Sequence, residues 1–355
     1  MPPSFHKVRI SSKEFLTEDA AEFTFSIPEE VQPEFMFLAG QYLTFKCQIQ
    51  GEEVRRSYSL CSSPGERLWK VGIKRVEHGV FSNYALDELQ VGDFVDVMTP
   101  MGNFQYNPAP LEAKNIVLFA AGSGITPILS IAKTVMSEEV NSSVTLFFGN
   151  KGFSSIMFIE ELENLKNKYL TRFRVIHLFS QESQGIPLQM GRINEEKLPL
   201  LHKAFLSHDA IDGIYVCGPE AMILAVKSYF EQTGLPKSAI HFELFHSGLA
   251  KTTTQEKVKM ASASCRVSLI IDDDQLVFDM METDNNLLDA AQKAGADVPY
   301  ACKGGVCCTC KAKILEGSAQ MRVNYALEAE EVEQGYVLTC QAVPTSSAIT
   351  ISFDE

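Results

Sequence analysis

Four cysteines near the C-terminus constrain this chain more than any other feature. Cys302, Cys307 and Cys310 have the spacing C-x4-C-x2-C, and Cys340 follows after 29 further residues. This spacing is typical of a [2Fe–2S] cluster, whose two irons need four thiolate ligands. A structural zinc site is the main alternative, but it usually has two CxxC pairs, and a [4Fe–4S] cluster would need a C-x2-C-x2-C run. We therefore predict a [2Fe–2S] cluster that transfers single electrons.

The remaining residues of the cysteine loop suit such a cluster. Gly304 and Gly305 let the backbone wrap tightly, so that its N–H groups can reach the cluster sulfurs. Cys308 is an extra thiol in the loop, and either a small residue filling a loop position or a redox-sensitive thiol would explain it. Three cysteines elsewhere have no partner at motif spacing and are predicted to be ordinary buried residues: Cys47, Cys61 and Cys265.

Charge and composition exclude several classes of function. The net charge of −14 over 355 residues argues against nucleic acid as a partner. Cys265–Glu355 carry 6 Lys and Arg against 15 Asp and Glu, a net charge of −9, which suits either docking to a basic redox partner or simple solubility. No signal peptide is visible at the N-terminus, and no apolar run approaches the ~20 residues that span a membrane. We expect a cytoplasmic protein with reduced cysteines and no membrane contact.

The hydrophobic pattern divides the chain into three domains and a linker. Residues 1–108 contain short alternating segments, which predict an all-β barrel or sandwich. Residues 112–246 begin with the continuous apolar run Ile116–Ala121, followed by a helical pattern, as in the parallel sheet of a nucleotide-binding α/β domain. Residues 247–264 are mainly small and polar and are predicted to be a linker. Residues 265–355 contain the cysteine motif.

Local signals refine the last domain. A hairpin is expected from the strands Arg266–Ile271 and Gln275–Met280, which flank the turn Asp272–Asp274. A helix is expected at about Leu287–Ala294, with Asn285 or Asn286 as its N-cap and a glycine just past its end.

Two groups of residues in the β-rich domain predict a flavin site. Arg56-Ser57-Tyr58-Ser59 combines a guanidinium fork for pyrophosphate, an aromatic ring to stack on the isoalloxazine and a hydroxyl for a ring nitrogen. Further along, Ile73-Lys74 precedes Gly79-Val80-Phe81-Ser82, which begins a predicted helix whose free N–H groups suit a phosphate. A surface turn would explain either group alone, but together they predict flavin binding.

Two loops in the α/β domain predict a dinucleotide site. Gly122-Ser123-Gly124-Ile125-Thr126-Pro127 follows a buried strand and starts a helix, although Thr126-Pro127 stands where G-x-G-x-x-G has its last glycine. Cys217-Gly218-Pro219 ends another strand, so both loops lie where open α/β sheets bind ligands; packing alone is the alternative for Cys217. Lys151 follows a strand end that has no acidic residue to bind the ribose 2′-OH of NADH. A lysine there could instead bind the 2′-phosphate of NADPH, which favours this cofactor unless the lysine is merely a solvated surface residue.

The motifs and their order resemble the ferredoxin–NADP reductase superfamily with a C-terminal plant-type [2Fe–2S] ferredoxin domain. The resemblance covers essentially the whole chain and rests on the strings RRSYSLC, AAGSGITP, PYACKGGVCCTCK and NYALE…GYVLTCQA. It implies a multidomain fold: an all-β flavin-binding barrel, an α/β nucleotide-binding domain and an α+β ferredoxin domain of the β-grasp type. It also implies FAD rather than FMN. Cys308 and Lys151 depart from the resemblance, where a small residue and an arginine are usual, and the second departure weakens the preference for NADPH.

The resemblance also implies roles for individual residues. The catalytic candidates are Ser59 near flavin N5, Cys217 near the nicotinamide, and Glu243 in the stretch that closes over the flavin. The flavin contacts would be Arg56, Tyr58, Ser59, Ile73, Lys74, Gly79, Phe81, Ser82 and Phe245. The nucleotide contacts would be Gly122, Ser123, Gly124, Thr126, Pro127, Lys151, Cys217, Gly218 and Pro219. The metal ligands would be Cys302, Cys307, Cys310 and Cys340.

The function implied by this resemblance is that of an NAD(P)H-dependent oxidoreductase, the electron-transfer component of a multicomponent monooxygenase. A hydride would pass from NADPH, or from NADH, to the flavin, and single electrons would pass through the cluster to a di-iron oxygenase subunit. The 7 histidines need no catalytic role in such chemistry. Three alternatives remain: a reductase for another oxygenase, either a Rieske enzyme or another di-iron hydroxylase; a non-enzymatic electron carrier; and a stand-alone reductase of small acceptors.

Overall fold

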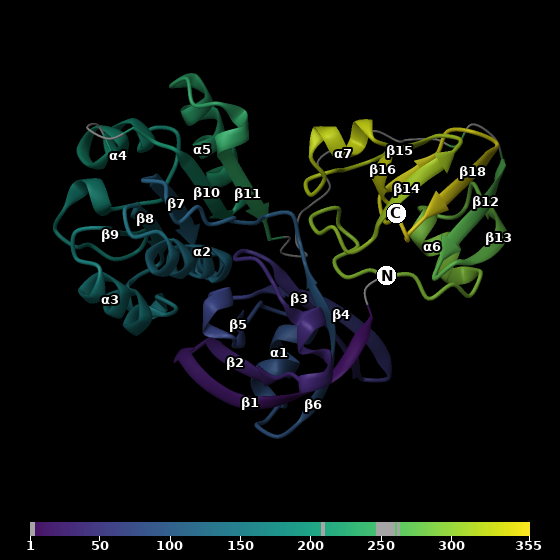
Figure 1. Ribbon diagram of the computed structural model, residues 1–355, viewed down its shortest axis with the longest axis horizontal. Coiled ribbons are helices and arrows are strands. Elements are labelled where there is room, and N and C mark those ends of the chain that lie inside the picture. The colour runs from purple at the N-terminus through teal and green to yellow at the C-terminus, as the bar shows by residue number, and fades with distance from the viewer. Residues whose placement is uncertain (1–3, 207–209, 246–259, 261–262) are drawn as a thin grey trace.

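Among the described residues three large sheets each form a lobe of their own (Figure 1), and a fourth, small sheet pairs β15 with β17. The computed structural model describes residues 4–206, 210–245, 260 and 263–355, so most of the predicted linker 247–264 lies outside the described residues. The first sheet has six strands, and the second and third have five each. This architecture agrees with the predicted multidomain fold class.

The N-terminal sheet is an antiparallel barrel with the strand order β4-β3-β6-β1-β2-β5. Leu60, directly after β4, forms an isolated bridge with Val71 of β5, so the two edge strands approach each other and close the barrel. Large apolar side chains such as Phe23 and Phe45 fill its interior. The elements are β1 (Phe5–Thr17), β2 (Ala20–Ser26), β3 (Tyr42–Ile49), β4 (Glu52–Ser59), β5 (Trp69–Lys74), α1 (Val80–Asp87) and β6 (Phe94–Met101).

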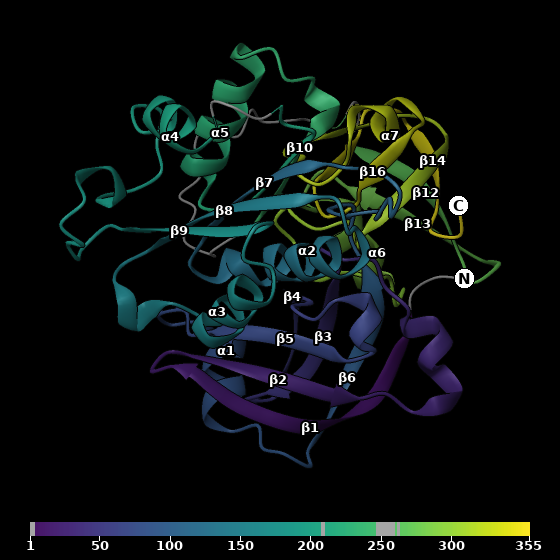
Figure 2. The same cartoon turned by 60° about the vertical axis from the view of Figure 1, so that its left-hand side comes forward.

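The middle sheet is parallel throughout, with the order β11-β10-β7-β8-β9. Its central strand is buried on both faces because helices cover both sides: α2 and α3 lie on one face, α4 and α5 on the other (Figure 2). The elements are β7 (Asn115–Ala121), α2 (Ile125–Glu138), β8 (Ser143–Asn150), α3 (Ile159–Lys168), β9 (Phe173–Phe179), α4 (Leu198–Phe205), β10 (Gly213–Gly218), α5 (Glu220–Gln232) and β11 (Ile240–Leu244).

The C-terminal sheet is mixed, with the order β13-β12-β18-β14-β16. Asp272 and Asp273 join β12 to β13 with φ angles of 55° and 62°, which is the geometry of a type I′ hairpin turn. Asn286 caps α6 by accepting the N–H of Asp289 at 2.8 Å, as predicted. The elements are β12 (Ser264–Ile271), β13 (Asp274–Met281), α6 (Leu287–Lys293), β14 (Lys311–Glu316), β15 (Ala319–Met321), α7 (Ala329–Glu333), β16 (Tyr336–Leu338), β17 (Ala342–Pro344) and β18 (Ala348–Ser352).

The barrel and the α/β domain share a hydrophobic core, because α2 packs directly on the barrel. Ser130 of α2 donates a hydrogen bond to the carbonyl of Ser62 at 2.6 Å. The C-terminal domain has a core of its own and meets the barrel through polar contacts and one small apolar cluster, made of Tyr42, Met101, Ala301, Cys302 and Cys307. Within the described residues, no helix is long and apolar enough to cross a membrane.

Candidate functional site

The four motif cysteines come together at one end of the C-terminal domain. Cys302 Sγ and Cys307 Sγ lie 3.1 Å apart on the loop before β14. The turn after β16 brings in Cys340, whose thiol hydrogen-bonds with that of Cys310. The backbone N–H of Gly304 points at Cys302 Sγ from 3.3 Å. Four thiols in two adjacent pairs, with a backbone donor aimed at sulfur, fit the ligand set of a [2Fe–2S] cluster.

The electrostatics of this loop favour thiolate. The hydrogen bond from Cys307 and then backbone N–H groups, including that of Gly304, lower the pKa of the Cys302 thiol to about 5, although burial opposes them. The pKa of the Cys340 thiol is also lowered, chiefly by the hydrogen bond from Cys310. In each pair the partner thiol, Cys307 or Cys310, has its pKa raised by the same hydrogen bond and by burial.

Of the predicted flavin residues, Arg56 is the one that lines a cavity between the barrel and the cluster domain. Arg56 of β4 and Val80 at the start of α1 both line this cavity of about 520 Å³. Tyr58, two residues along β4, packs against the Phe81 ring at 5.5 Å. Tyr300, Ala301, Cys302 and Lys303 of the cluster domain close the other side of the cavity. Arg56 thus shares this cavity with residues of the cluster loop, while the other predicted flavin contacts lie outside its lining.

One side-chain hydrogen bond organises the first turn of α1. The Ser82 hydroxyl is buried and accepts the backbone N–H of Val76 at 3.1 Å, so it stabilises the turn that leads into the helix. Gly79 is required there, because a Cβ at this position would lie 2.7 Å from Ser82 Oγ. Ile73 is buried and Lys74 lies 3.5 Å from the Asp19 carboxylate, both on β5.

The three catalytic candidates meet where the barrel faces the α/β sheet. Ser59 Oγ at the end of β4 donates to Glu243 Oε2 of β11 at 3.0 Å. Cys217 is the register partner of Glu243 on the neighbouring strand β10 and is fully buried. Burial raises the pKa of the Glu243 carboxyl to about 8, although the hydrogen bond from Ser59 lowers it. Phe245 is partly buried against the shared core beside them.

The two predicted nucleotide loops lie side by side at the carboxyl ends of β7 and β10. Gly124 sits so close to β10 that a Cβ there would lie 2.3 Å from the Cys217 carbonyl oxygen. Gly122 has a φ of 54° and open space beside it, whereas Gly218 packs against Met222. Thr126 turns its hydroxyl back to the Ser123 carbonyl at 3.1 Å, and Pro127 is buried inside α2. The adjacent Pro219 caps α5.

Lys151 lies at the same edge, directly after β8, with an exposed side chain. Its carbonyl accepts the N–H of Gln181, which follows β9. Glu182 binds the N–H of Phe153 at 2.8 Å and thereby holds the turn after Lys151. This acidic residue comes from a different strand end, so inspection of the segment after β8 alone does not find it.

One contact between the barrel and the cluster domain was not predicted from the sequence. The Tyr42 hydroxyl of β3 accepts the backbone N–H of Cys308 at 3.2 Å and lies 3.1 Å from Thr309 Oγ1. Arg55 of β4 adds an ion pair with Asp297 at 3.3 Å. These partners are more than 200 residues apart in sequence and carry no motif, so no local signal identifies them.

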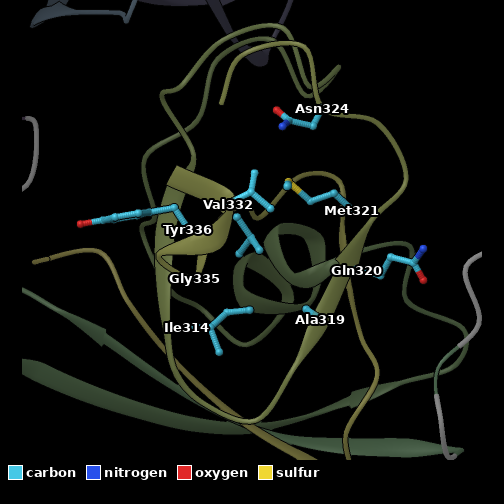
Figure 3. A pocket seen from close by; sticks show the side chains of 9 residues that line it. Ile314, Ala319, Gln320, Met321, Asn324, Val332, Gly335 and Tyr336 are labelled. Atoms are coloured by element: carbon cyan, nitrogen blue, oxygen red, sulfur yellow. The ribbon is translucent and has the colours of Figure 1, made fainter. Parts of the chain in front are cut away.

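A second cavity, of about 380 Å³, lies within the cluster domain and is separate from the predicted cofactor residues (Figure 3). Met321, Val332 and Tyr336 are among its lining residues. None of the residues predicted to bind a cofactor lines it.

Comparison with protein families identifies the three domains. Residues 7–106 match the oxidoreductase FAD-binding domain, residues 118–228 the oxidoreductase NAD-binding domain, and residues 269–345 the 2Fe-2S iron-sulfur cluster binding domain. The chain is therefore an NAD(P)H-dependent oxidoreductase that uses FAD and a [2Fe–2S] cluster, as its motifs predict.

Similarity to whole proteins extends over the full length of the chain. One subunit of 1,2-phenylacetyl-CoA epoxidase from Escherichia coli is 39% identical over 99% of this chain and 98% of its own. The strings RRSYSLC and PYACKGGVCCTCK predict a resemblance to the reductase subunit of that epoxidase, which this identity confirms. The ferredoxin reductase component of 3-ketosteroid-9-alpha-monooxygenase from Rhodococcus rhodochrous is 32% identical over 95% of this chain and 93% of its own.

The solved structure of phthalate dioxygenase reductase, described as modular for electron transfer from pyridine nucleotides to [2Fe–2S], has a TM-score of 0.60 and 25% identity. The match covers 98% of each chain, so the three-domain architecture is common to both. Together with the sequence relatives, it shows that this chain belongs to the ferredoxin–NADP reductase superfamily, in the family of reductases with a C-terminal [2Fe–2S] domain that includes the epoxidase component from Escherichia coli.

Proposed function

We propose that this chain is the reductase component that passes electrons from NADPH through FAD and [2Fe–2S] to the di-iron oxygenase subunit of a phenylacetyl-CoA ring epoxidase, in phenylacetate degradation. The similarity to the Escherichia coli protein, over nearly the whole of both chains, carries this proposal. We further propose that it works in the cytoplasm, because cysteines that bind iron need a reducing compartment.

The proposed roles follow from where the residues lie. Cys302, Cys307, Cys310 and Cys340 would hold the cluster, which accepts and releases one electron at a time. Arg56 would bind the flavin phosphate from β4, assisted by the N–H groups that open α1 at Gly79 and Phe81. Tyr58 would pack on the isoalloxazine.

The nucleotide would lie across the loops after β7 and β10. The close approach of Gly124 to Cys217 leaves no room for a side chain between the loops, so backbone N–H groups face the dinucleotide. This directs the nicotinamide towards Cys217 and the Ser59–Glu243 pair. Bound FAD supplies the hydride-accepting chemistry, while Ser59 and Glu243 hold a proton beside it.

A second candidate function is the same electron transfer to a different oxygenase. The ferredoxin reductase component of a 3-ketosteroid monooxygenase is also 32% identical over nearly the whole chain, so the domain order alone does not select the partner. Surface complementarity to the oxygenase would make that selection.

Anaerobic titration with NADPH, and separately with NADH, tests the proposal. We expect bleaching of the flavin spectrum and a rhombic [2Fe–2S] EPR signal, followed by product formation when the phenylacetyl-CoA oxygenase subunits are added. If neither nucleotide bleaches the flavin, the chain is not the proposed reductase. If the cofactors are reduced but only a steroid-type oxygenase is supplied with electrons, the second candidate replaces the first.

Replacing Lys151 with alanine tests the preference for NADPH. An exposed ammonium beside the ribose would form a charge-assisted bond to the 2′-phosphate, so we expect the KM for NADPH to rise about tenfold while the KM for NADH and both kcat values stay unchanged. Lys168→Ala, an exposed lysine at the end of α3, is the matched control. An equal rise in KM for both nucleotides would show that Lys151 does not read the phosphate.

A further inference from the structure

The cluster domain is seated on the barrel by contacts of three kinds. At the centre, Tyr42 and Met101 of the barrel form one apolar cluster with Ala301, Cys302 and Cys307. On one flank, Arg55 pairs with Asp297 at 3.3 Å, and its guanidinium lies 4.2 Å from the centre of the Tyr300 ring. On the other flank, Asn103 Nδ2 donates to Glu331 Oε2 at 2.7 Å. The central contact reaches the ligand loop through a side-chain hydroxyl, and Asn103 also reaches this loop, through a backbone hydrogen bond to Cys308.

Tyr42 makes that central contact with its hydroxyl. The oxygen accepts the N–H of Cys308 at 3.2 Å and lies 3.1 Å from Thr309 Oγ1, and the tyrosine is 4% exposed. Both partners lie between the ligands Cys307 and Cys310. A buried hydroxyl whose hydrogen bonds reach only the other domain is satisfied when the domains are docked, and it has to find water when they part.

The tyrosine ring is also held in place from behind. Gly102 lies directly against it, since a Cβ there would be 3.0 Å from the ring carbons. This contact restricts the ring, so the hydroxyl points at the cluster loop in a fixed direction. Such a pre-organised donor–acceptor pair specifies the distance and the orientation of the docked loop.

The position of Tyr42 in the barrel links it to the flavin side as well. Tyr42 is the first residue of β3, and its register partner on β4 is Ser59, the residue proposed to lie near flavin N5. Of this cross-strand pair, Ser59 lies at the proposed hydride site and Tyr42 contacts the cluster loop. The route between the two cofactors passes this strand pair.

We propose that Tyr42 is a positioning residue that holds the cluster loop on the flavin domain in the arrangement that receives electrons. The inference rests on the proposed function, in which NAD(P)H delivers two electrons as a hydride to the flavin. Each internal transfer then moves one electron from the reduced flavin to the cluster, and no covalent bond forms or breaks in that step. Tyr42 sets the rate of this transfer by fixing the docked geometry.

The test is Tyr42→Phe in the full-length protein loaded with FAD and iron, studied by anaerobic stopped-flow spectroscopy. We expect flavin reduction by NADPH to keep its rate, because hydride transfer does not involve the docked loop. Reduction of the cluster is expected to slow about tenfold, the effect of losing one hydrogen bond of ordinary strength. Tyr84→Phe, a half-buried tyrosine on α1 away from the cluster domain, is the matched control and keeps both rates.

A second variant approaches the same contact from the other domain. Thr309→Val removes the hydroxyl partner and also the hydrogen bond of that hydroxyl with the Cys307 thiol, so we expect a selective slowing of cluster reduction at least as large as in Tyr42→Phe. EPR spectra and cofactor content of each variant establish that the cluster is assembled. An unchanged rate of cluster reduction in loaded Tyr42→Phe overturns the proposal, and so does equal slowing in Tyr84→Phe. If the unmodified protein shows no flavin bleaching, the proposed function fails instead, so the two failures are distinct.

Discussion

Cys340→Ser is expected to abolish electron delivery to the oxygenase while leaving reduction of the flavin by NADPH intact. Cys340 is the one predicted ligand that lies outside the loop, and its thiol is paired with that of Cys310. Serine offers a hard oxygen in place of a soft thiolate, and three remaining cysteines cannot complete the coordination of two irons. The rate of electron transfer to the oxygenase should therefore fall by at least about a hundredfold, because the chain loses a whole cofactor.

Three measurements follow this prediction: iron content, the EPR signal after reduction, and oxygenase turnover. Cys308→Ser is the matched control, because this thiol is in the same loop but turns to the Ala326 carbonyl at 3.3 Å. The control should keep its iron and its signal. A Cys340→Ser protein with a full [2Fe–2S] signal would mean that another thiol, with Cys308 the nearest candidate, replaces the lost ligand.

Glu243→Gln is expected to remove a pH dependence from hydride transfer, because glutamine is uncharged at every pH. The raised pKa of about 8 keeps the carboxyl protonated at neutral pH. As the pH rises through that value, a negative charge develops next to Ser59, where it opposes the arriving hydride. The rate in the unmodified protein should therefore be high below pH 8 and fall above it.

The rate of flavin bleaching in single-turnover experiments, measured across the pH range, checks this expectation. Glutamine develops no negative charge at any pH, so its profile should be flat and should lack the fall above pH 8. Glu22→Gln is the matched control: burial also raises the pKa of that carboxyl, but its partners are Lys70 and Cys61 in the barrel. If the step near pH 8 persists in Glu243→Gln, a different group is responsible for it.

How far the sequence predicts this molecule depends on the distance over which each signal acts. The cysteine loop and the Asn286 cap are local patterns, and both are visible in short strings. The buried strand β7 is equally plain, because a run of apolar residues covered on both faces needs no knowledge of its neighbours.

Contacts between residues that are far apart in the sequence leave no local pattern, so the sequence does not predict them. Strand β1 covers 13 residues, but buried and exposed side chains alternate over only part of that length. The sequence therefore lacks the regular apolar–polar alternation that would predict this strand. The Ser59–Glu243 bond joins residues 184 positions apart, and the resemblance implies only that each of them lies near the flavin, not that they bond to each other. The Tyr42–Cys308 contact joins residues 266 positions apart, and tyrosine is an ordinary strand residue, so nothing distinguished it.

The distribution of hydrophobic cores determines which domains of such a protein can be exchanged during evolution. The barrel and the α/β domain bury side chains in one common core, so neither can be exchanged without repacking the other. The cluster domain has its own core and touches the barrel through a few side chains, with Tyr42 and Cys307 among them. A gene could therefore gain, lose or exchange this last domain as a unit, and the residues that would have to adapt are the apolar cluster around Tyr42 and the polar contacts of Arg55, Asn103 and Glu220.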